Sequence, residues 1–297
     1  MTRTTLVTIT CSRDRAMQKL QSYTIDKFVQ GSCNHIIIVE DNKISLSEWQ
    51  TELAPFYNKH QLMLFDTLLD TDSYQNDSVK KNGWHRSALL KLMVAERVNT
   101  EKYLLLDSKN FFVRQVNLDS WPCDEGNHLV EPLHSNGQLS NGQLSNGRSW
   151  PNLFQFGKKH SIPITKNTYS TTTPFMVKTN TVKNLLKLDI ASLFLNNTGW
   201  SSELFLYSVY AQYLGTKLIN GPTVNVTFWN SERTADTKTL TDIFSWANVL
   251  TFGVHRNFMR INFDLTELYN FLEFIDFDRQ LVQTCFDQYR KDLNEQR

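Results

Sequence analysis

The first half of the chain alternates short apolar runs with helix-like segments, and this alternation restricts the fold more than any other feature. The run His35–Val39 is nearly continuous in apolar residues, as expected of a strand that is covered on both faces. Leu6–Cys11, Leu62–Phe65 and Tyr103–Leu106 are further strand candidates. Strands that alternate with helices favour βαβ units. The sequence therefore predicts an α/β fold with a mixed, mostly parallel sheet flanked by helices.

Helical spacing of apolar residues predicts the segments that connect and follow these strands. The first expected helix is Arg15–Val29, with Asp14 as its N-cap. Two more strands are expected at Phe175–Val177 and Val249–Phe252. The other expected helices are Ser47–Asn58, Gly83–Val98, Asn180–Leu188, Trp200–Leu214 with Ser201 or Ser202 as its cap, and two amphipathic helices within Leu265–Leu293 that break near Asp276–Asp278.

No proline-rich linker divides the chain, which predicts one domain over residues 1–260 and a C-terminal helical extension over residues 261–297. In the middle, Ser135-Asn-Gly-Gln-Leu139 recurs as Ser140–Leu144, and a third copy starts at Ser145. Five residues are too few for repeats of roughly 20–50 residues, and Asn-Gly pairs favour turns. We expect residues 135–148 to form a flexible loop. The alternative is a lid over a binding site.

Charge and hydropathy exclude several classes of protein. The 31 basic and 30 acidic side chains nearly cancel, which argues against a nucleic-acid partner held by bulk charge. No apolar stretch approaches the roughly 18–20 residues that cross a bilayer. Leu6–Ile9 is too short for the core of a signal peptide. We expect a cytoplasmic protein without a transmembrane segment, and the sequence leaves the oligomeric state open.

Polar residues follow three of the predicted strands, at Ser12–Asp14, Glu40–Asn42 and Asp107–Asn110. Ligands of open parallel sheets bind beyond the carboxyl ends of the strands. An acid such as Asp107 can contact a sugar hydroxyl or a metal there, or it can cap a turn. The sequence contains no Walker A loop, GxGxxG, HExxH or GxSxG motif.

Several short motifs follow one another in a fixed order over roughly residues 4–260: Leu6–Asp14, Ile36–Asp41, Gly83-Trp84-His85-Arg86-Ser87 with Leu90-Lys91-Leu92, Glu101–Phe112, Trp200-Ser-Ser-Glu203 and His255-Arg256. Together they resemble glycosyltransferases of the GT-A type, the nucleotide-diphospho-sugar transferase superfamily. More narrowly, they resemble an uncharacterised glycosyltransferase-like family of bacteria and phages. The resemblance implies a Rossmann-type nucleotide-sugar-binding domain that carries C-terminal helices.

The implied activity is hexosyltransferase-like: transfer of a sugar from a nucleoside-diphosphate donor, UDP-linked, to a glycan or another hydroxyl acceptor. The alternative is a non-catalytic protein that keeps the fold and binds sugar nucleotides or glycans. A third class, a structural interaction protein, would leave Asp41, Asp107 and Lys109 pointing away from any shared cleft.

The resemblance also implies the site residues. It places Asp41 at the base or ribose, and it aligns Asp107 with the first acid of the DxD motif, near the ribose and diphosphate. Arginine pairs with diphosphate oxygens through a planar fork, although Arg13 can equally be a solvated charge and Arg86 can cover a helix start. The residues implied in nucleotide or sugar binding are Thr10, Ser12, Arg13, Asp41, Arg86, Asp107, Lys109, Asn110 and His255.

Lys109 makes the DxD motif degenerate, because it stands where the last acid of the motif would bind Mn²⁺ or Mg²⁺. A charged lysine cannot bind the metal, but it can supply the positive charge itself. We expect one of three outcomes: metal-independent transfer, a metal held by Asp107 and His255 alone, or loss of catalysis. An ordinary surface lysine is the alternative.

Glu203 lies where this fold places a carboxylate on the helix that faces the acceptor, and it is the candidate catalytic base. A glutamate in the first turn of a helix is also favourable without any catalytic role. His255 is a metal ligand, a diphosphate contact or a structural histidine on these arguments.

Overall fold

The computed structural model describes residues 4–67, 83–121, 130–132, 151–164, 173–195, 202–216, 225–228, 241, 245, 249–259 and 264–295. The predicted loop over residues 135–148 lies outside these ranges. Within them, no helix has the length and apolar character needed to cross a membrane.

The central sheet has the strand order β3-β2-β1-β4-β7. Strands β1 to β4 are parallel and β7 is antiparallel to β4, which confirms the mixed, mostly parallel α/β fold. The predicted strands lie within two residues of the observed bounds. These bounds are β1 Thr4–Thr10, β2 Asn34–Val39, β3 Gln61–Asp66, β4 Lys102–Asp107 and β7 Phe175–Lys178.

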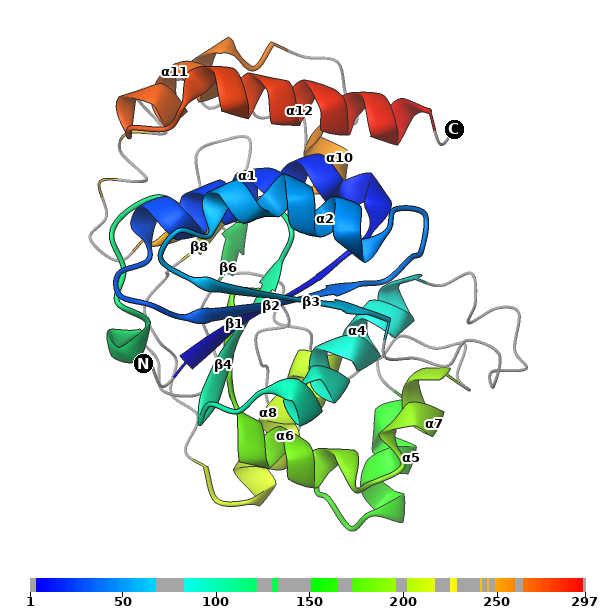
Figure 1. The fold of residues 1–297 in the computed structure, drawn as a ribbon. Coiled ribbons are helices and arrows are strands. Elements are labelled where there is room, and N and C mark those ends of the chain that lie inside the picture. Colours follow the sequence, from blue (N-terminus) through cyan, green and yellow to red (C-terminus); the bar gives the residue numbers. More distant parts are fainter. Residues whose placement is uncertain are drawn as a thin grey trace.

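Helices cover both faces of this sheet, and α1 and α2 lie on one face with α4, α6 and α8 on the other (Figure 1). Alternate residues of the strands divide between the two layers. Leu6 and Leu104 pack with α1, whereas Val7 and Leu105 pack with α4 and α8. The helices are α1 Arg15–Phe28, α2 Leu46–Leu53, α4 Gly83–Met93, α5 Pro151–Lys159, α6 Thr179–Leu186, α7 Ile190–Leu195 and α8 Glu203–Tyr213. Short 3-10 turns follow β1 (η1, Ser12–Asp14), α2 (η2, Ala54–Phe56), α4 (η4, Val94–Arg97) and β5 (η5, Leu118–Ser120).

A second sheet, in the order β5-β9-β8-β6, extends from the end of β4. Gly253 of β9 permits its close approach to the neighbouring strands, because a Cβ there would lie 2.9 Å from Thr227 Oγ1 and 3.0 Å from Asn110 Nδ2. The sequence predicted β9 two residues too early, and the other three strands were not predicted. The strands are β5 Asn110–Phe112, β6 Val130–Pro132, β8 Asn225–Phe228 and β9 Thr251–Val254.

The C-terminal segment forms α10 (Arg256–Met259), α11 (Thr266–Phe274) and α12 (Arg279–Asn294), and the predicted break near residues 276–278 is confirmed. Figure 1 shows α12 lying outside α1, and its Phe286 and Tyr289 belong to the same apolar cluster as Leu20 of α1. The C-terminal extension therefore shares a hydrophobic core with the sheet domain.

Candidate functional site

The candidate site lies at the carboxyl ends of β1, β2 and β4. The chain runs from β1 outward to β2 and β3, and β4 then pairs with the opposite side of β1. The strand order therefore reverses between β1 and β4. Open α/β sheets bind their ligands at such a switch point.

The first charged cluster joins η1, which follows β1, to the turn after β4. Lys109 Nζ donates to Asp14 Oδ2 at 2.5 Å, and Ser108 Oγ donates to the same oxygen at 3.0 Å. Arg13 Nε donates to Asp14 Oδ1 at 3.3 Å. Burial raises the pKa of Asp14, but the charges of Lys109 and Arg13 outweigh burial and hold this pKa below its ordinary value. The Asp14 carboxylate is therefore charged.

Asp14 corrects one prediction. It stands at the N-cap position of α1, yet its side chain makes no capping hydrogen bond. Its carboxylate turns instead to Lys109, far along the chain. A buried ammonium without a counter-charge is costly, so the ion pair takes precedence over the cap.

The second cluster is centred on Lys91 of α4. Its Nζ lies 3.1 Å from Asp107 Oδ1 and 3.0 Å from Glu203 Oε1. The Lys91 side chain is 11% exposed and that of Glu203 5%, whereas that of Asp107 is 48% exposed. Burial lowers the pKa of Lys91, but the two carboxylates outweigh burial and raise it above its ordinary value. Lys91 is thus a charged, buried link between the end of β4 and the start of α8.

Local structure explains how Glu203 reaches this cluster. Ser202 Oγ accepts from the Phe205 backbone N–H at 3.3 Å, which confirms one of the two predicted caps. Glu203 is the first residue of α8 and is buried beside Lys91. Ser201 and Trp200 lie outside the described residues.

Further contacts tie the end of β2 to the segment after β1 through Asp41 and to α4 through Glu40. Asp41 accepts from the Ser12 backbone N–H at 3.1 Å and from Ser12 Oγ at 2.6 Å. Glu40 Oε1 lies 3.7 Å from Arg86 Nε, and Arg86 donates to the Glu40 carbonyl at 3.0 Å. Burial raises the pKa of Glu40 to about 7 despite the nearby Arg86 charge.

The remaining predicted residues, Thr10, Asn110 and His255, lie at the same edge, where hydrogen bonds tie them to neighbouring segments. The Thr10 carbonyl accepts from the Glu40 N–H at 2.8 Å, and Asn110 Oδ1 accepts from the Asp107 N–H at 2.8 Å. The His255 N–H donates to the Phe228 carbonyl at 2.8 Å. The N–H of the preceding residue, Val254, donates to the Lys109 carbonyl at 3.1 Å. The end of β9 therefore lies against the turn that carries Lys109.

The donor set of this edge does not fit a divalent cation in its present arrangement. Among the residues that the structure describes, no three His, Cys, Asp or Glu side chains gather as a metal site. Asp107 faces the ammonium of Lys91, and Asp14 faces that of Lys109. The ammonium groups of these two lysines already neutralise both carboxylates.

Sequence reasoning missed Lys91 and the ion-pair role of Asp14. A usable signal was present, because Lys91 interrupts the apolar run Leu89–Met93 and a lysine buried in such a run is almost always paired with an acid. The identity of that acid could not be read from the chain, because Asp107 and Glu203 lie on different elements.

Comparisons with known proteins add a family but no activity. The comparison with curated proteins finds no match. Among solved structures, the chain is similar to the crystal structure of mouse xyloside xylosyltransferase 1 in its apo form, with a TM-score of 0.45 and 9% identity over 84% of this chain and 96% of that one. Residues 17–242 match the family described as a family of unknown function, DUF6492. Since this match spans most of the sequence, the chain belongs to the DUF6492 family.

Proposed function

We propose that the chain is a glycosyltransferase of the GT-A type. It would move a sugar from a nucleoside-diphosphate donor, UDP-linked, to a hydroxyl acceptor such as a glycan. One observation carries the proposal: the Lys109–Asp14 pair and the Lys91–Asp107–Glu203 cluster meet at the switch point between β1 and β4. Charged side chains at this edge of an open sheet are typical of a site for a charged ligand.

The proposed binding roles follow from the chemistry of the side chains. Asp41 and Asp107 would accept hydrogen bonds from base or ribose hydroxyls, with Thr10, Ser12, Asn110 and His255 around them. Arg13, Arg86 and Lys109 would meet the diphosphate, where guanidinium groups form bidentate contacts and an ammonium acts as a point charge. Lys109 has three N–H donors, and Asp14 and Ser108 engage two of them. A phosphate oxygen can take the third.

In the proposed transfer, Glu203 acts as the base. Written for an inverting reaction, the acceptor oxygen forms a bond to the anomeric carbon while the bond from that carbon to the donor phosphate breaks. Glu203 takes the proton of the acceptor hydroxyl, and the departing diphosphate keeps the bonding electron pair beside the cationic side chains. In this proposal Lys109 supplies charge that Mn²⁺ or Mg²⁺ supplies in a complete DxD motif.

The second candidate is a protein that binds sugar nucleotides or glycans without catalysis. Two observations favour it: Lys109 replaces the second acid of the motif, and Glu203 is buried against Lys91. The enzyme and a sugar-nucleotide binder both require nucleotide binding at the same edge, whereas a glycan binder does not.

Thermal melting with UDP, GDP and CDP, each with and without Mn²⁺, tests both candidates. A ligand at 100 times its dissociation constant adds about 2.7 kcal/mol of stability. Stabilisation by a nucleotide without Mn²⁺ would support Lys109 as the charge substitute. If none of the three nucleotides stabilises the protein, the transferase and the sugar-nucleotide binder both fail, and only a glycan binder is left.

Donor hydrolysis then separates the enzyme from the binder. A panel of nucleotide sugars is incubated with the wild type, with Glu203→Gln and with Glu101→Gln, a control at an exposed position. The enzyme proposal predicts turnover that falls at least about a hundredfold in Glu203→Gln and persists in the control. Nucleotide binding without turnover in any protein would leave the binder as the correct function.

A further inference from the structure

A buried side-chain amide closes the turn that carries the site. Gln21 of α1 is fully buried, and its Nε2 donates to the carbonyls of Asp107 at 2.6 Å and of Asn110 at 3.0 Å. These two residues stand at the two ends of the turn between β4 and β5. One amide group thus holds both ends of the segment that bears Asp107 and Lys109.

The orientation of this amide is fixed by its other partners. Gln21 Oε1 accepts from Thr8 Oγ1 at 2.8 Å and from Gln18 Nε2 at 2.9 Å. Both N–H donors and two acceptor positions of the amide are therefore used. Carbonyls only accept hydrogen bonds, so the Gln21 nitrogen has to face the turn.

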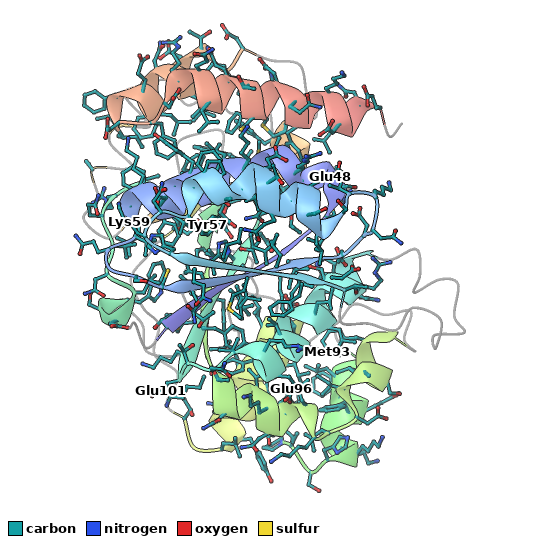
Figure 2. The ribbon with its side chains drawn as sticks, viewed as in Figure 1. Glu48, Tyr57, Lys59, Met93, Glu96 and Glu101 are labelled. Atoms are coloured by element: carbon teal, nitrogen blue, oxygen red, sulfur yellow. The ribbon has the colours of Figure 1, made fainter. Side chains whose placement is uncertain are left out.

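The direction of the next hydrogen bonds, from donor to acceptor, is fixed in the same way and continues into the sheet. The single hydroxyl hydrogen of Thr8 goes to Gln21, so the Thr8 hydroxyl accepts from His35 Nε2, 2.9 Å away. His35 Nδ1 then accepts from the hydroxyl of Tyr57 at 2.6 Å. Tyr57 is labelled in Figure 2 between the α1–α2 layer and the sheet. Burial lowers the pKa of His35 to about 3, so the ring is neutral and keeps this order.

Further bonds tie the same segment to its surroundings. The Asp107 N–H donates to Asn110 Oδ1 at 2.8 Å, and the Phe112 N–H donates to Thr24 Oγ1 at 3.2 Å, one turn along α1 from Gln21. The side chains of Asp107 and Lys109 leave this fixed backbone toward Lys91 and Asp14. A shift of the turn would displace both charged clusters together.

We propose that Gln21 is a positioning residue, which sets the β4–β5 turn and thereby places Asp107 and Lys109 for the ligand. The part that concerns ligand binding rests on the proposed function. Gln21 itself lies beneath the turn and touches the site through the backbone alone.

The substitution Gln21→Glu tests this role with almost no change in side-chain volume. A protonated glutamic acid can donate one hydrogen bond to the turn, whereas the carboxylate can donate none and would repel both carbonyls. Burial and these carbonyls favour the neutral acid and raise the pKa of the introduced carboxyl. The dissociation constant of UDP for Gln21→Glu, relative to the wild type, is therefore expected to rise with pH between pH 5 and 9, by up to about tenfold per pH unit above that pKa.

Two more variants separate positioning from simple loss of stability. Gln21→Met removes all four bonds and should raise the dissociation constant of UDP about tenfold at every pH. Ser22→Ala is the matched control from the same helix. The Ser22 hydroxyl contacts the Gln18 carbonyl and the Tyr57 hydroxyl, and it makes no hydrogen bond with the β4–β5 turn. This substitution should lower the melting temperature while leaving UDP affinity at the wild-type value.

Backbone hydrogen exchange supplies a readout that needs no ligand. The amides of Asp107–Phe112 should exchange faster in Gln21→Met and in Gln21→Glu at pH 9 than in Ser22→Ala. Wild-type exchange in these amides, together with wild-type UDP affinity across the pH range, would overturn the proposal.

If the wild type binds no nucleoside diphosphate, the proposed function fails and exchange alone decides the role of Gln21. If Gln21→Met does not fold, amide exchange of Gln21→Glu at pH 5 and at pH 9 tests the role of Gln21 instead.

Discussion

The ammonium of Lys91 lies 3.1 Å from the carboxylate of Asp107, and the same nitrogen lies 3.0 Å from Glu203. One buried lysine therefore compensates an acid at the end of β4 and another at the start of α8. This contact links the proposed nucleotide-binding acid to the proposed base.

Replacement of Lys91 by Met should lower the free energy of unfolding by about 3–5 kcal/mol, because it leaves Glu203 buried without a counter-charge. Urea unfolding at pH 7 measures this change. The exposed substitution Lys187→Met is the control. The double variant Lys91→Met with Glu203→Gln should recover part of the loss, and a strictly additive loss would contradict the coupling of the two residues.

Glu40 should make the protein less stable as pH rises from 4.5 to about 7. Its pKa is raised to about 7 in the folded chain from 4.5, so the folded state holds the proton more tightly than the unfolded state over this window. At roughly 1.4 kcal/mol per pH unit, the loss approaches about 3 kcal/mol by pH 8. Urea unfolding between pH 4.5 and 8 should show a flatter pH profile for Glu40→Gln. The exposed substitution Glu101→Gln should keep the wild-type slope, and a wild-type slope in Glu40→Gln would refute the assignment.

His35 should make the protein less stable as pH falls below 6.5, the opposite of the pH dependence expected from Glu40. Burial lowers its pKa from 6.5 to about 3, so the unfolded chain binds the proton first and stability falls as pH decreases from 6.5 toward 3. The expected loss is on the order of 4 kcal/mol over this window. Unfolding of His35→Gln should show a shallower dependence on pH below 6.5. His160→Gln serves as the control, and an unchanged acid profile in His35→Gln would count against a neutral His35.

Under the proposed function, an acid at position 109 should create a metal-binding site. In Lys109→Asp, three carboxylates would stand together at Asp14, Asp107 and position 109, with the ammonium that now faces Asp14 removed. Hard oxygen ligands of this kind favour Mg²⁺ or Mn²⁺. Mn²⁺ should raise the melting temperature of Lys109→Asp by several degrees relative to a chelator. The surface variant Lys187→Asp should not respond, and an equal response of both variants would argue against a site at position 109.

The central sheet could be predicted because its strands are covered on both faces. Continuous apolar runs such as His35–Val39 are required by that burial, and they were visible in the sequence. Strands β5, β6 and β8 of the second sheet were hidden because they have only three or four residues and contain polar side chains. Thr251 Oγ1 donates to Asn225 Oδ1 at 2.8 Å, so these buried polar residues satisfy one another across two strands. Periodicity along the chain does not reveal such a pairing.

The location of the candidate site at one edge of the sheet could be predicted from the sequence, but the contacts among its residues could not. The rule for parallel strands brought Asp41 and Asp107 to one edge. The pairing of Asp14 with Lys109 could not be derived, because an acid before a helix has an equally good local use as a cap. Gln21 gave no signal, since its partners are backbone carbonyls of a distant turn.

The measurement that tests the central claim most directly is isothermal titration calorimetry of the wild type and Lys109→Met with nucleoside mono- and diphosphates of uridine, guanosine and cytidine. Without added metal, the wild type should bind one diphosphate at least about tenfold more tightly than its monophosphate, and Lys109→Met should lose most of this preference. Absence of diphosphate binding in the wild type, or a preference for the diphosphate that is unchanged in Lys109→Met, would contradict the proposed site.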